Sequence, residues 1–188
     1  MIIVNVLGAP ASGKSTAAAQ LFSRLKELNC NCELIQEEAK LWCIEGKEIG
    51  KYGQFYLFGV ECHNQSRLFN AVDIGISDSS PILAAFYNYY YSNKQDNSVA
   101  ITCREFYKRA KTDNVEVVNF LLPRRKKYVT KGRYQTEEEA KEVEVQLQEW
   151  LDSEGYEYHY INCSDSKRIN TMLGILQDIA GDFDGLLG

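Results

Sequence analysis

The chain has 188 residues, of which 45% are hydrophobic and 12% aromatic, and its formal net charge is −5. A chain of this length and composition can bury a complete core, so we expect a single domain over residues 1–188. The acidic balance excludes a protein whose whole surface is built to bind a polyanion, although it leaves room for a local basic patch.

Cysteine usage and the first residues indicate the compartment. The six cysteines, at positions 30, 32, 43, 62, 103 and 163, form no C-x-x-C pair, so we expect reduced thiols rather than a zinc site. The chain enters a β-branched segment directly after Met1, without the charged and apolar regions of a signal peptide. Its apolar runs are too short for a membrane span. We therefore expect a cytoplasmic protein that makes no membrane contact.

Hydrophobic patterning predicts strands that alternate with helices. The expected strands are 2–7, 32–36, 72–77, 115–122 and 156–161. The expected helices are 14–28, 37–44, 52–71, 81–91, 98–111, 136–154 and 166–180. This alternation predicts a three-layer α/β fold with a five-stranded parallel sheet and helices on both faces. The short, glycine-rich, acidic segment 181–188 is expected to be a flexible tail.

A phosphate-binding motif follows the first strand. Residues 8–15 read G-A-P-A-S-G-K-S and match G-x-x-x-x-G-K-[ST], the P-loop or Walker A motif. The glycines let backbone N–H groups point at phosphate oxygens, and the N-terminus of the next helix adds positive potential. Lys14 supplies a cation for the β- and γ-phosphates, and the Ser15 hydroxyl is a Mg²⁺ ligand. We therefore expect ATP and Mg²⁺ to be bound by Gly8, Ala9, Ala11, Ser12, Gly13, Lys14, Ser15 and Thr16.

Acidic residues follow the second and third predicted strands. Asp78 is a candidate Mg²⁺ ligand, or the group that accepts the proton of an acceptor hydroxyl; capping the helix that begins at Pro81 is a compatible role. Glu37 and Glu38 end the second strand at the same edge of the sheet, and either is a candidate general base that would leave Asp78 to the metal. Lys40 is placed to pair with one of them or to contact a phosphate.

A basic segment separates the fourth strand from the next helix. Residues 123–136 are interpreted as a lid, because kinases stabilise the transferred phosphoryl group with arginines on a closing loop. A solvated basic loop is the alternative. The basic residues are Arg124, Arg125, Lys126, Lys127, Lys131 and Arg133, and Thr136 with Glu139 forms a capping box where the next helix begins.

With the P-loop motif, the expected three-layer fold is of the P-loop NTPase type. Motifs that the sequence lacks then indicate which kind of P-loop protein it is. It has neither N-K-x-D after the fourth strand nor D-x-x-G after the third, so a switch GTPase is disfavoured. A single Asp78, rather than an acidic pair, ends the third strand, which disfavours a motor ATPase. A kinase is favoured, and an ATPase module that acts with a protein or DNA partner, without a phosphorylated acceptor, is the alternative. His63 shares a helix face with Arg67, which would suit an anionic or base-bearing substrate, but a packing or surface role is expected.

Several segments beyond the P-loop resemble small P-loop kinases of tailed bacteriophages. They are Q-E-E-A-K at 36–40, the helix around 55–69, S-D-S-S-P at 77–81 and G-R-Y-Q-T-E-E at 132–138, and the resemblance extends to about residue 160. Those proteins are similar to thymidylate and nicotinamide-riboside kinases, and one branch, the 5-hydroxymethyluracil DNA kinases, phosphorylates modified bases in phage DNA.

The resemblance implies a set of roles for this chain. It assigns nucleotide binding to the P-loop, places Glu37 and Asp78 at the reacting centre, and places Arg124 and Arg133 on the lid. It also implies a nucleoside, a nucleotide or hydroxymethylated DNA as the acceptor, with 5-hydroxymethyluracil in DNA as the leading candidate and DNA modification in the host cytoplasm as the setting. A base in a duplex must be extruded to react, and the aromatic run 86–91 offers stacking groups, although core packing explains the same residues equally well.

Overall fold

A computed structural model describes residues 1–50, 52–125 and 134–180. Its strands are β1 (Ile2–Leu7), β2 (Cys32–Ile35), β3 (Ile74–Ser77), β4 (Glu116–Leu121) and β5 (His159–Tyr160). They form one sheet in the order β2-β3-β1-β4-β5, and every neighbouring pair is parallel. The predicted five-stranded parallel sheet is therefore confirmed.

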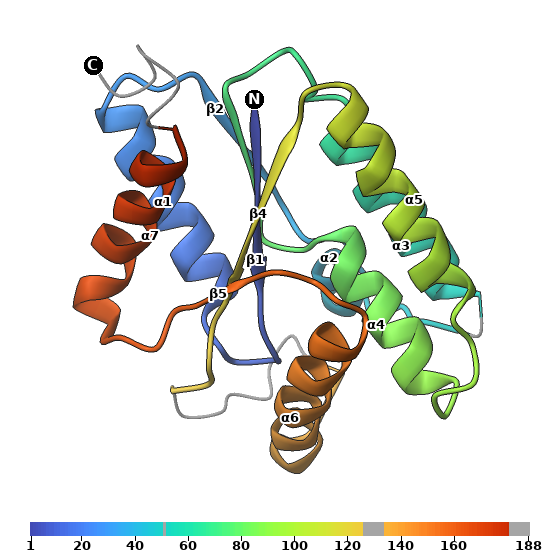
Figure 1. Cartoon of the computed structure of the whole chain (residues 1–188). Helices are drawn as coiled ribbons and strands as arrows, with labels where there is room; N and C mark the ends of the chain where they lie inside the picture. Colours follow the sequence, from blue (N-terminus) through green and yellow to red (C-terminus); the bar gives the residue numbers. More distant parts are fainter. Residues whose placement is uncertain (51, 126–133, 181–188) are drawn as a thin grey trace.

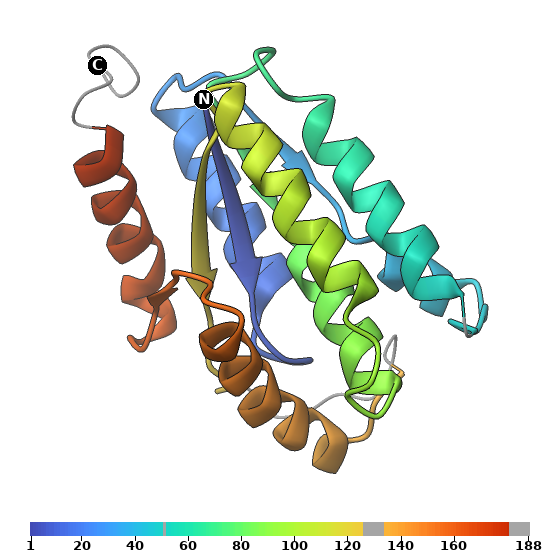
Figure 2. The same ribbon diagram turned by 45° about the vertical axis from the view of Figure 1, so that its right-hand side comes forward.

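Helices cover both faces of this sheet (Figures 1 and 2). They are α1 (Lys14–Glu27), α2 (Glu38–Ile44), α3 (Gly53–Ser66), α4 (Pro81–Tyr91), α5 (Ser98–Thr112), α6 (Glu137–Ser153) and α7 (Asp165–Ala180). One core lies between the sheet and α1 with α7, and a second lies on the opposite side among α4, α5 and α6. The three-layer α/β architecture follows from these two cores.

The central strand β1 positions the phosphate loop. All six of its residues are buried, and Ile2, Val4 and Val6 pack into the core that contains α1 and α7. Its neighbours in the sheet are β3 and β4. Because the carboxyl ends of parallel strands meet at one edge of a sheet, the segments after β1, β3 and β4 converge there. The P-loop, Asp78 and the start of the lid are therefore neighbours.

A buried polar network ties α3 and α5 to the sheet. The Asn5 amide donates to Asn119 Oδ1 at 2.9 Å and to the Tyr107 hydroxyl at 3.2 Å. Gln65 Nε2 donates to Asn5 Oδ1 at 2.8 Å, and the Tyr107 hydroxyl donates to Gln65 Oε1 at 3.2 Å. These buried side chains are hydrogen-bond partners of one another, so the network fixes the position of α3 relative to β1.

Two predicted elements are much longer than the observed ones. The helix expected over 52–71 ends at Ser66, since the following residues form successive turns and Asn70 adopts a positive φ of 59°. The strand expected over 156–161 pairs with β4 only at His159 and Tyr160. The N–H of Tyr156 instead donates to the Leu151 carbonyl, so that residue closes the end of α6. Residues 126–133 of the predicted basic segment and the predicted tail 181–188 lie outside the described residues.

Cysteines and hydropathy agree with the expectations from the sequence. All six cysteines are free thiols. Over the ranges that the structure covers, no helix has both the length and the apolar character needed to span a membrane.

The network around Asn5 gives a stability prediction. Asn5→Ala should lower the free energy of unfolding by about 1–3 kcal/mol, because it removes the hydrogen-bond partner of Gln65 Nε2 and of Asn119 Oδ1. Tyr107→Phe is the matched control, since it keeps both amide pairs and should cost less. Urea unfolding followed by circular dichroism measures both, and equal stability losses would contradict the assigned importance of Asn5.

Candidate active site

The P-loop has a backbone that only small residues allow. Gly8 and Gly13 have φ angles of 149° and 89°, and Ala11 also has a positive φ, of 70°. A Cβ atom at Gly8 would lie 2.6 Å from the carbonyl oxygen of Leu122 and 2.6 Å from Ser12 Oγ. Gly8 therefore has no room for a side chain, and the loop turns tightly enough to surround a phosphate group.

Lys14 lies against this loop at the start of α1. Its Nζ donates to the carbonyl oxygen of Gly8 at 2.9 Å and is 3.4 Å from that of Ala9. Ser15 and Thr16 follow in the first turn of α1, which contains no acidic residue. The N-terminus of α1 thus combines unpaired backbone N–H groups with a lysine, which is the arrangement expected for phosphate binding.

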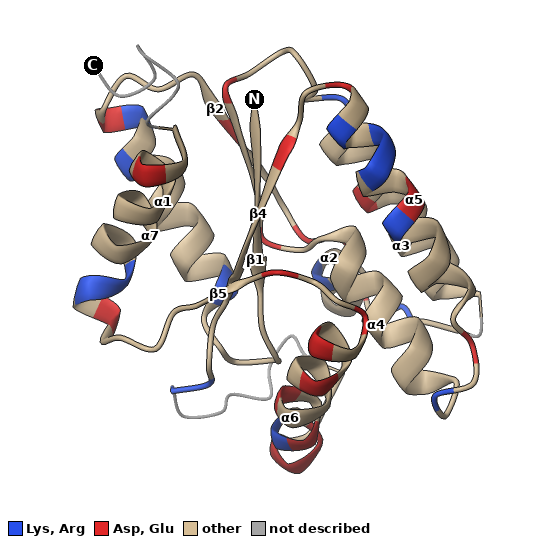
Figure 3. Ribbon diagram, viewed as in Figure 1, with Lys and Arg blue, Asp and Glu red and all other residues tan. Residues whose placement is uncertain are grey.

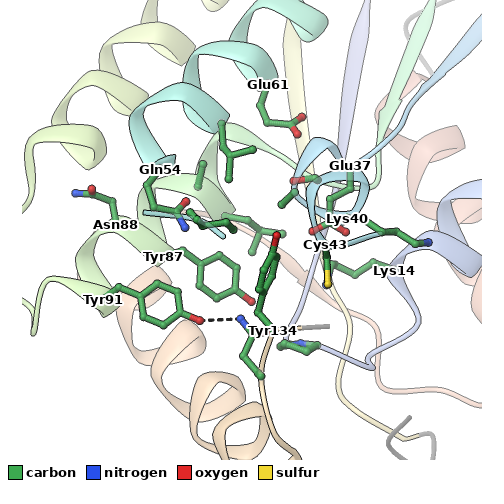
Figure 4. A pocket seen from close by; sticks show the side chains of 18 of the residues that line it. Lys14, Glu37, Lys40, Cys43, Gln54, Glu61, Tyr87, Asn88, Tyr91 and Tyr134 are labelled. Atoms are coloured by element: carbon green, nitrogen blue, oxygen red, sulfur yellow. Dashed lines mark hydrogen bonds between the residues drawn. The ribbon is translucent and has the colours of Figure 1, made fainter. Parts of the chain in front are cut away.

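A cavity of about 1230 Å³ opens beside the P-loop (Figure 4). One side of it is formed by the P-loop and α2, and the others by α3, α4 and the segment that leads into α6. Its polar and aromatic lining residues include Lys14, Ser15, Thr16, Glu37, Lys40, Glu48, Gln54, Phe55, Glu61, Tyr87, Asn88, Tyr91, Asp96, Tyr134, Gln135 and Glu139. The volume is sufficient for two small substrates side by side.

The structure separates the acidic candidates. Glu37 immediately precedes α2 and lines the cavity, whereas Glu38 accepts a hydrogen bond from the Trp42 indole at 3.1 Å and is not a lining residue. Asp78 is only 7% exposed, and its Oδ1 is buried without a hydrogen-bond partner. Its backbone N–H donates to the Ile35 carbonyl at 3.2 Å, which fixes Asp78 beside the end of β2. The N-cap residue of α4 is Ser80, whose hydroxyl accepts a hydrogen bond from the Leu83 N–H.

A further carboxyl group, Glu61 on α3, was missed by the sequence analysis. It is 2% exposed and lines the cavity. Its pKa is raised to about 8, chiefly by burial and also by the negative charges of Glu37 and Asp78, while hydrogen bonds from the Glu38 N–H and the Ser79 hydroxyl partly oppose the shift. Its spacing of four and three residues from the apolar Leu57 and Phe58 is the sequence signal that places Glu61 on the buried face of α3.

The described part of the lid contacts two sides of the cavity. Arg124 donates its backbone N–H to Glu144 Oε1 at 2.5 Å, and its guanidinium lies 3.5 Å from the Glu137 carbonyl, so it rests against the strongly acidic α6 (Figure 3). Beyond the gap, the Tyr134 hydroxyl donates to the Lys47 carbonyl at 2.5 Å and Gln135 Nε2 donates to the Tyr91 hydroxyl at 2.7 Å. The predicted lid residue Arg133 lies outside the described residues.

The remaining candidates from the sequence divide between core, surface and cavity. In the aromatic run, Phe86 is buried in the core, while Tyr87 and Tyr91 stack on one another at a centroid distance of 5.8 Å and line the cavity. Core packing is therefore confirmed for Phe86, whereas stacking of Tyr87 and Tyr91 on a substrate base stays a prediction. His63 and Arg67 are exposed and do not line the cavity.

The residues present fit a Mg²⁺ ion bound together with a nucleotide. Within the described ranges, His, Cys, Asp and Glu side chains form no cluster of three or more suited to a metal ion. Mg²⁺ in nucleotide sites needs fewer protein ligands, because phosphate oxygens and waters complete its shell. Ser15 lines the cavity, and Asp78 has a buried oxygen without a partner. These are the oxygen donors that such an ion uses.

Comparison with known proteins agrees with this geometry. A family model described as an AAA domain matches residues 3–168. No curated protein matches the sequence. Deoxyadenosine kinase from M. mycoides, solved with the products dCMP and dCDP, has a TM-score of 0.57 at 16% identity, over 94% of this chain and 99% of that one. The NadR protein in complex with NR has a TM-score of 0.70 at 16% identity, over 95% of this chain and 51% of that one. At these identities the solved structures show the shared fold.

Glu61 gives a prediction on the pH dependence of stability. Its pKa in the folded protein, about 8, exceeds its ordinary value of 4.5, so the folded state retains a proton that the unfolded state has lost. This contribution to stability is complete below pH 4.5 and is lost as the pH rises to 8. The wild-type protein should therefore lose up to about 1 kcal/mol per pH unit across this range through Glu61.

Two variants test this assignment by urea unfolding at several pH values, in buffer with EDTA and without nucleotide. Glu61→Gln should flatten the slope of stability against pH, because an amide does not titrate there. Glu149→Gln, which changes an exposed glutamate of α6, is the matched control and should keep the wild-type slope. A Glu61→Gln slope equal to that of the wild type would contradict the raised pKa.

Proposed function

We propose that this chain, which belongs to the AAA domain family, is a kinase that transfers the γ-phosphate of ATP to a hydroxyl group of a nucleoside. One observation carries the proposal: a single cavity has the P-loop on one side and amide and aromatic side chains on the others. A phosphate donor and a ring-bearing acceptor would lie in it together. Binding both in one cavity turns a bimolecular reaction into an effectively unimolecular one.

The donor side of the cavity would bind ATP. The amides of the P-loop and the N-terminus of α1 would bind the phosphates, and the Lys14 ammonium would leave the Gly8 carbonyl for the β- and γ-phosphate oxygens. Ser15 and Asp78 would hold Mg²⁺, which when bound neutralises charge on the phosphate oxygens. The lid arginines Arg124 and Arg133 are proposed to approach the transferred phosphoryl group when the lid closes.

The acceptor side fits a planar, uncharged molecule. Tyr87 and Tyr91 offer aromatic faces, and Gln54 and Asn88 are amides that pair with the polar edge of a base. The lining includes the acidic residues Glu37, Glu48, Glu61, Asp96 and Glu139, against the basic Lys14 and Lys40 among the residues described. This excess of acidic groups favours a nucleoside over a nucleotide that brings a phosphate of its own.

Glu37 is assigned the role of the group that accepts the proton of the acceptor hydroxyl. Glu37 lines the cavity, while Glu38 is engaged with Trp42. With Asp78 given to the metal, Glu37 is the carboxylate left to act as general base. The solved deoxyadenosine kinase with bound dATP supports a nucleoside as the acceptor class, through the fold that the two chains share.

The phage resemblance makes a 5-hydroxymethyl base the most specific candidate within this class. Its hydroxymethyl group would be the phosphorylated hydroxyl, in a free nucleoside or in DNA. In DNA the base would have to leave the helix, and Tyr87 and Tyr91 would stack on it. A phage protein acting in the cytoplasm of its host remains part of this proposal.

Label transfer from [γ-³²P]ATP tests the proposal. With Mg²⁺ present, the acceptors are the deoxynucleosides, 5-hydroxymethyldeoxyuridine, the corresponding 5′-monophosphates, plain DNA and DNA that contains 5-hydroxymethyluracil. We expect label in at least one nucleoside. Label confined to the modified DNA would make the protein a DNA-base kinase. Free phosphate without any labelled acceptor would contradict a kinase and favour the ATPase module.

Two lysine variants of α1 accompany this assay. Lys14→Ala should lower the transfer rate by at least about 100-fold, because it removes a charge that stabilises the transferred phosphoryl group. Lys26→Ala changes an exposed lysine near the other end of the same helix and should keep the wild-type rate. Full activity of Lys14→Ala would overturn the P-loop assignment.

A further inference from the structure

We propose that Glu61 is an acceptor-binding residue, whose side chain forms a hydrogen bond with an uncharged polar group of the nucleoside inside the cavity. The inference rests on the nucleoside kinase function proposed above and adds a specificity-determining contact to it. The partner it selects is a group that both donates and accepts hydrogen bonds, such as a sugar hydroxyl or an amide edge of a base.

The geometry of Glu61 is the first support. The side chain is 2% exposed, yet it lines the cavity, and its Oε2 is buried without a hydrogen-bond partner. Figure 4 shows the carboxyl group pointing from α3 toward the side of the cavity where Glu37 lies. A buried polar atom without a partner destabilises the protein, and a ligand with a complementary group would remove that cost.

Its neighbours define the kind of ligand. Burial, together with the nearby negative groups Glu37 and Asp78, raises the pKa of Glu61 to about 8, so Glu61 retains its proton at neutral pH. A protonated carboxyl has one O–H donor and one carbonyl acceptor. A phosphate at this position would meet three acidic side chains, whereas a hydroxyl or an amide would satisfy Glu61 without introducing another charge.

The surrounding residues hold the Glu61 side chain in one position. One turn before Glu61, Leu57 and Phe58 are buried in the core. One turn after it, the side-chain amide of Gln65 is held by hydrogen bonds with Asn5 and Tyr107. The Ser79 hydroxyl and the Glu38 N–H hold the carboxyl group from outside α3. A hydrogen-bonding group held this way loses little entropy when a ligand binds, which suits a specificity contact.

A purely structural role for Glu61, as a link between α3 and the start of α2, is the competing explanation. The two roles differ in what a substitution changes. A structural link would alter ATP and nucleoside binding together, because the P-loop, Glu37 and α3 share the cavity. A specificity contact would alter nucleoside binding alone.

The test measures nucleoside and ATP binding separately. Isothermal titration calorimetry gives the Kd of deoxyadenosine, deoxycytidine, thymidine and deoxyguanosine, each titrated into the ATP-free protein, and steady-state kinetics give KM for the best acceptor and for ATP. Glu61→Ala should raise the nucleoside Kd and KM at least about fivefold. The KM for ATP should stay within about twofold.

Two further variants distinguish the explanations. Glu61→Gln should keep the nucleoside Kd within about threefold of wild type, since an amide also donates and accepts. Gln65→Leu, one turn away on the same helix but outside the cavity lining, should lower stability without a selective loss of nucleoside binding.

Three outcomes would overturn the assignment: an unchanged nucleoside Kd in Glu61→Ala, equal losses for ATP and nucleoside, or Glu61→Gln no better than Glu61→Ala. Nucleoside binding without phosphoryl transfer by the wild-type protein would contradict the kinase function, yet the Kd comparison would still decide the role of Glu61. A wild-type protein that binds neither these four nucleosides nor 5-hydroxymethyldeoxyuridine would overturn both.

Discussion

The close approach of Gly8 to the Leu122 carbonyl is the constraint on which the site depends. It places the P-loop directly at the end of the buried strand β1, against the segment that continues β4 into the lid. A side chain at position 8 would push these two segments apart. Because β3 lies on the other side of β1, the same strand end also brings Asp78 to the P-loop. The donor site is thus a consequence of strand order and one glycine.

The cavity beside this loop has two chemically different sides. Lys14, the P-loop amides and the α1 N-terminus provide positive potential on one of them. Carboxyl groups accumulate around the others, and burial together with these charges raises the pKa of Glu61 to about 8. The proposed function places phosphates on the first side and an uncharged ring on the others. This division of charge would let a protein with a net charge of −5 bind ATP and discriminate among acceptors.

Local patterns predicted much of this arrangement. The P-loop was recognisable because its strand, turn and helix are contiguous, and the Thr136–Glu139 capping box is formed as its spacing predicts. Glu37 and Asp78 were selected as candidates because parallel strands end at one edge of the sheet, and their catalytic and metal-binding roles stay predictions. Glu61 and the contact between Tyr134 and Lys47 were not predicted, since both depend on how α3, α4 and the lid pack together. The choice between Glu37 and Glu38 likewise required the position of Trp42.

Joint occupancy of one cavity by donor and acceptor is the central claim. The most direct measurement is the affinity of a bisubstrate analogue, adenosine joined through five phosphates to deoxyadenosine, compared with ATP and deoxyadenosine measured separately. If the two sites share the cavity, the analogue should bind at least about 100-fold more tightly than ATP and should displace both ligands. An analogue that binds no more tightly than ATP, and that leaves nucleoside binding unchanged, would contradict the shared cavity.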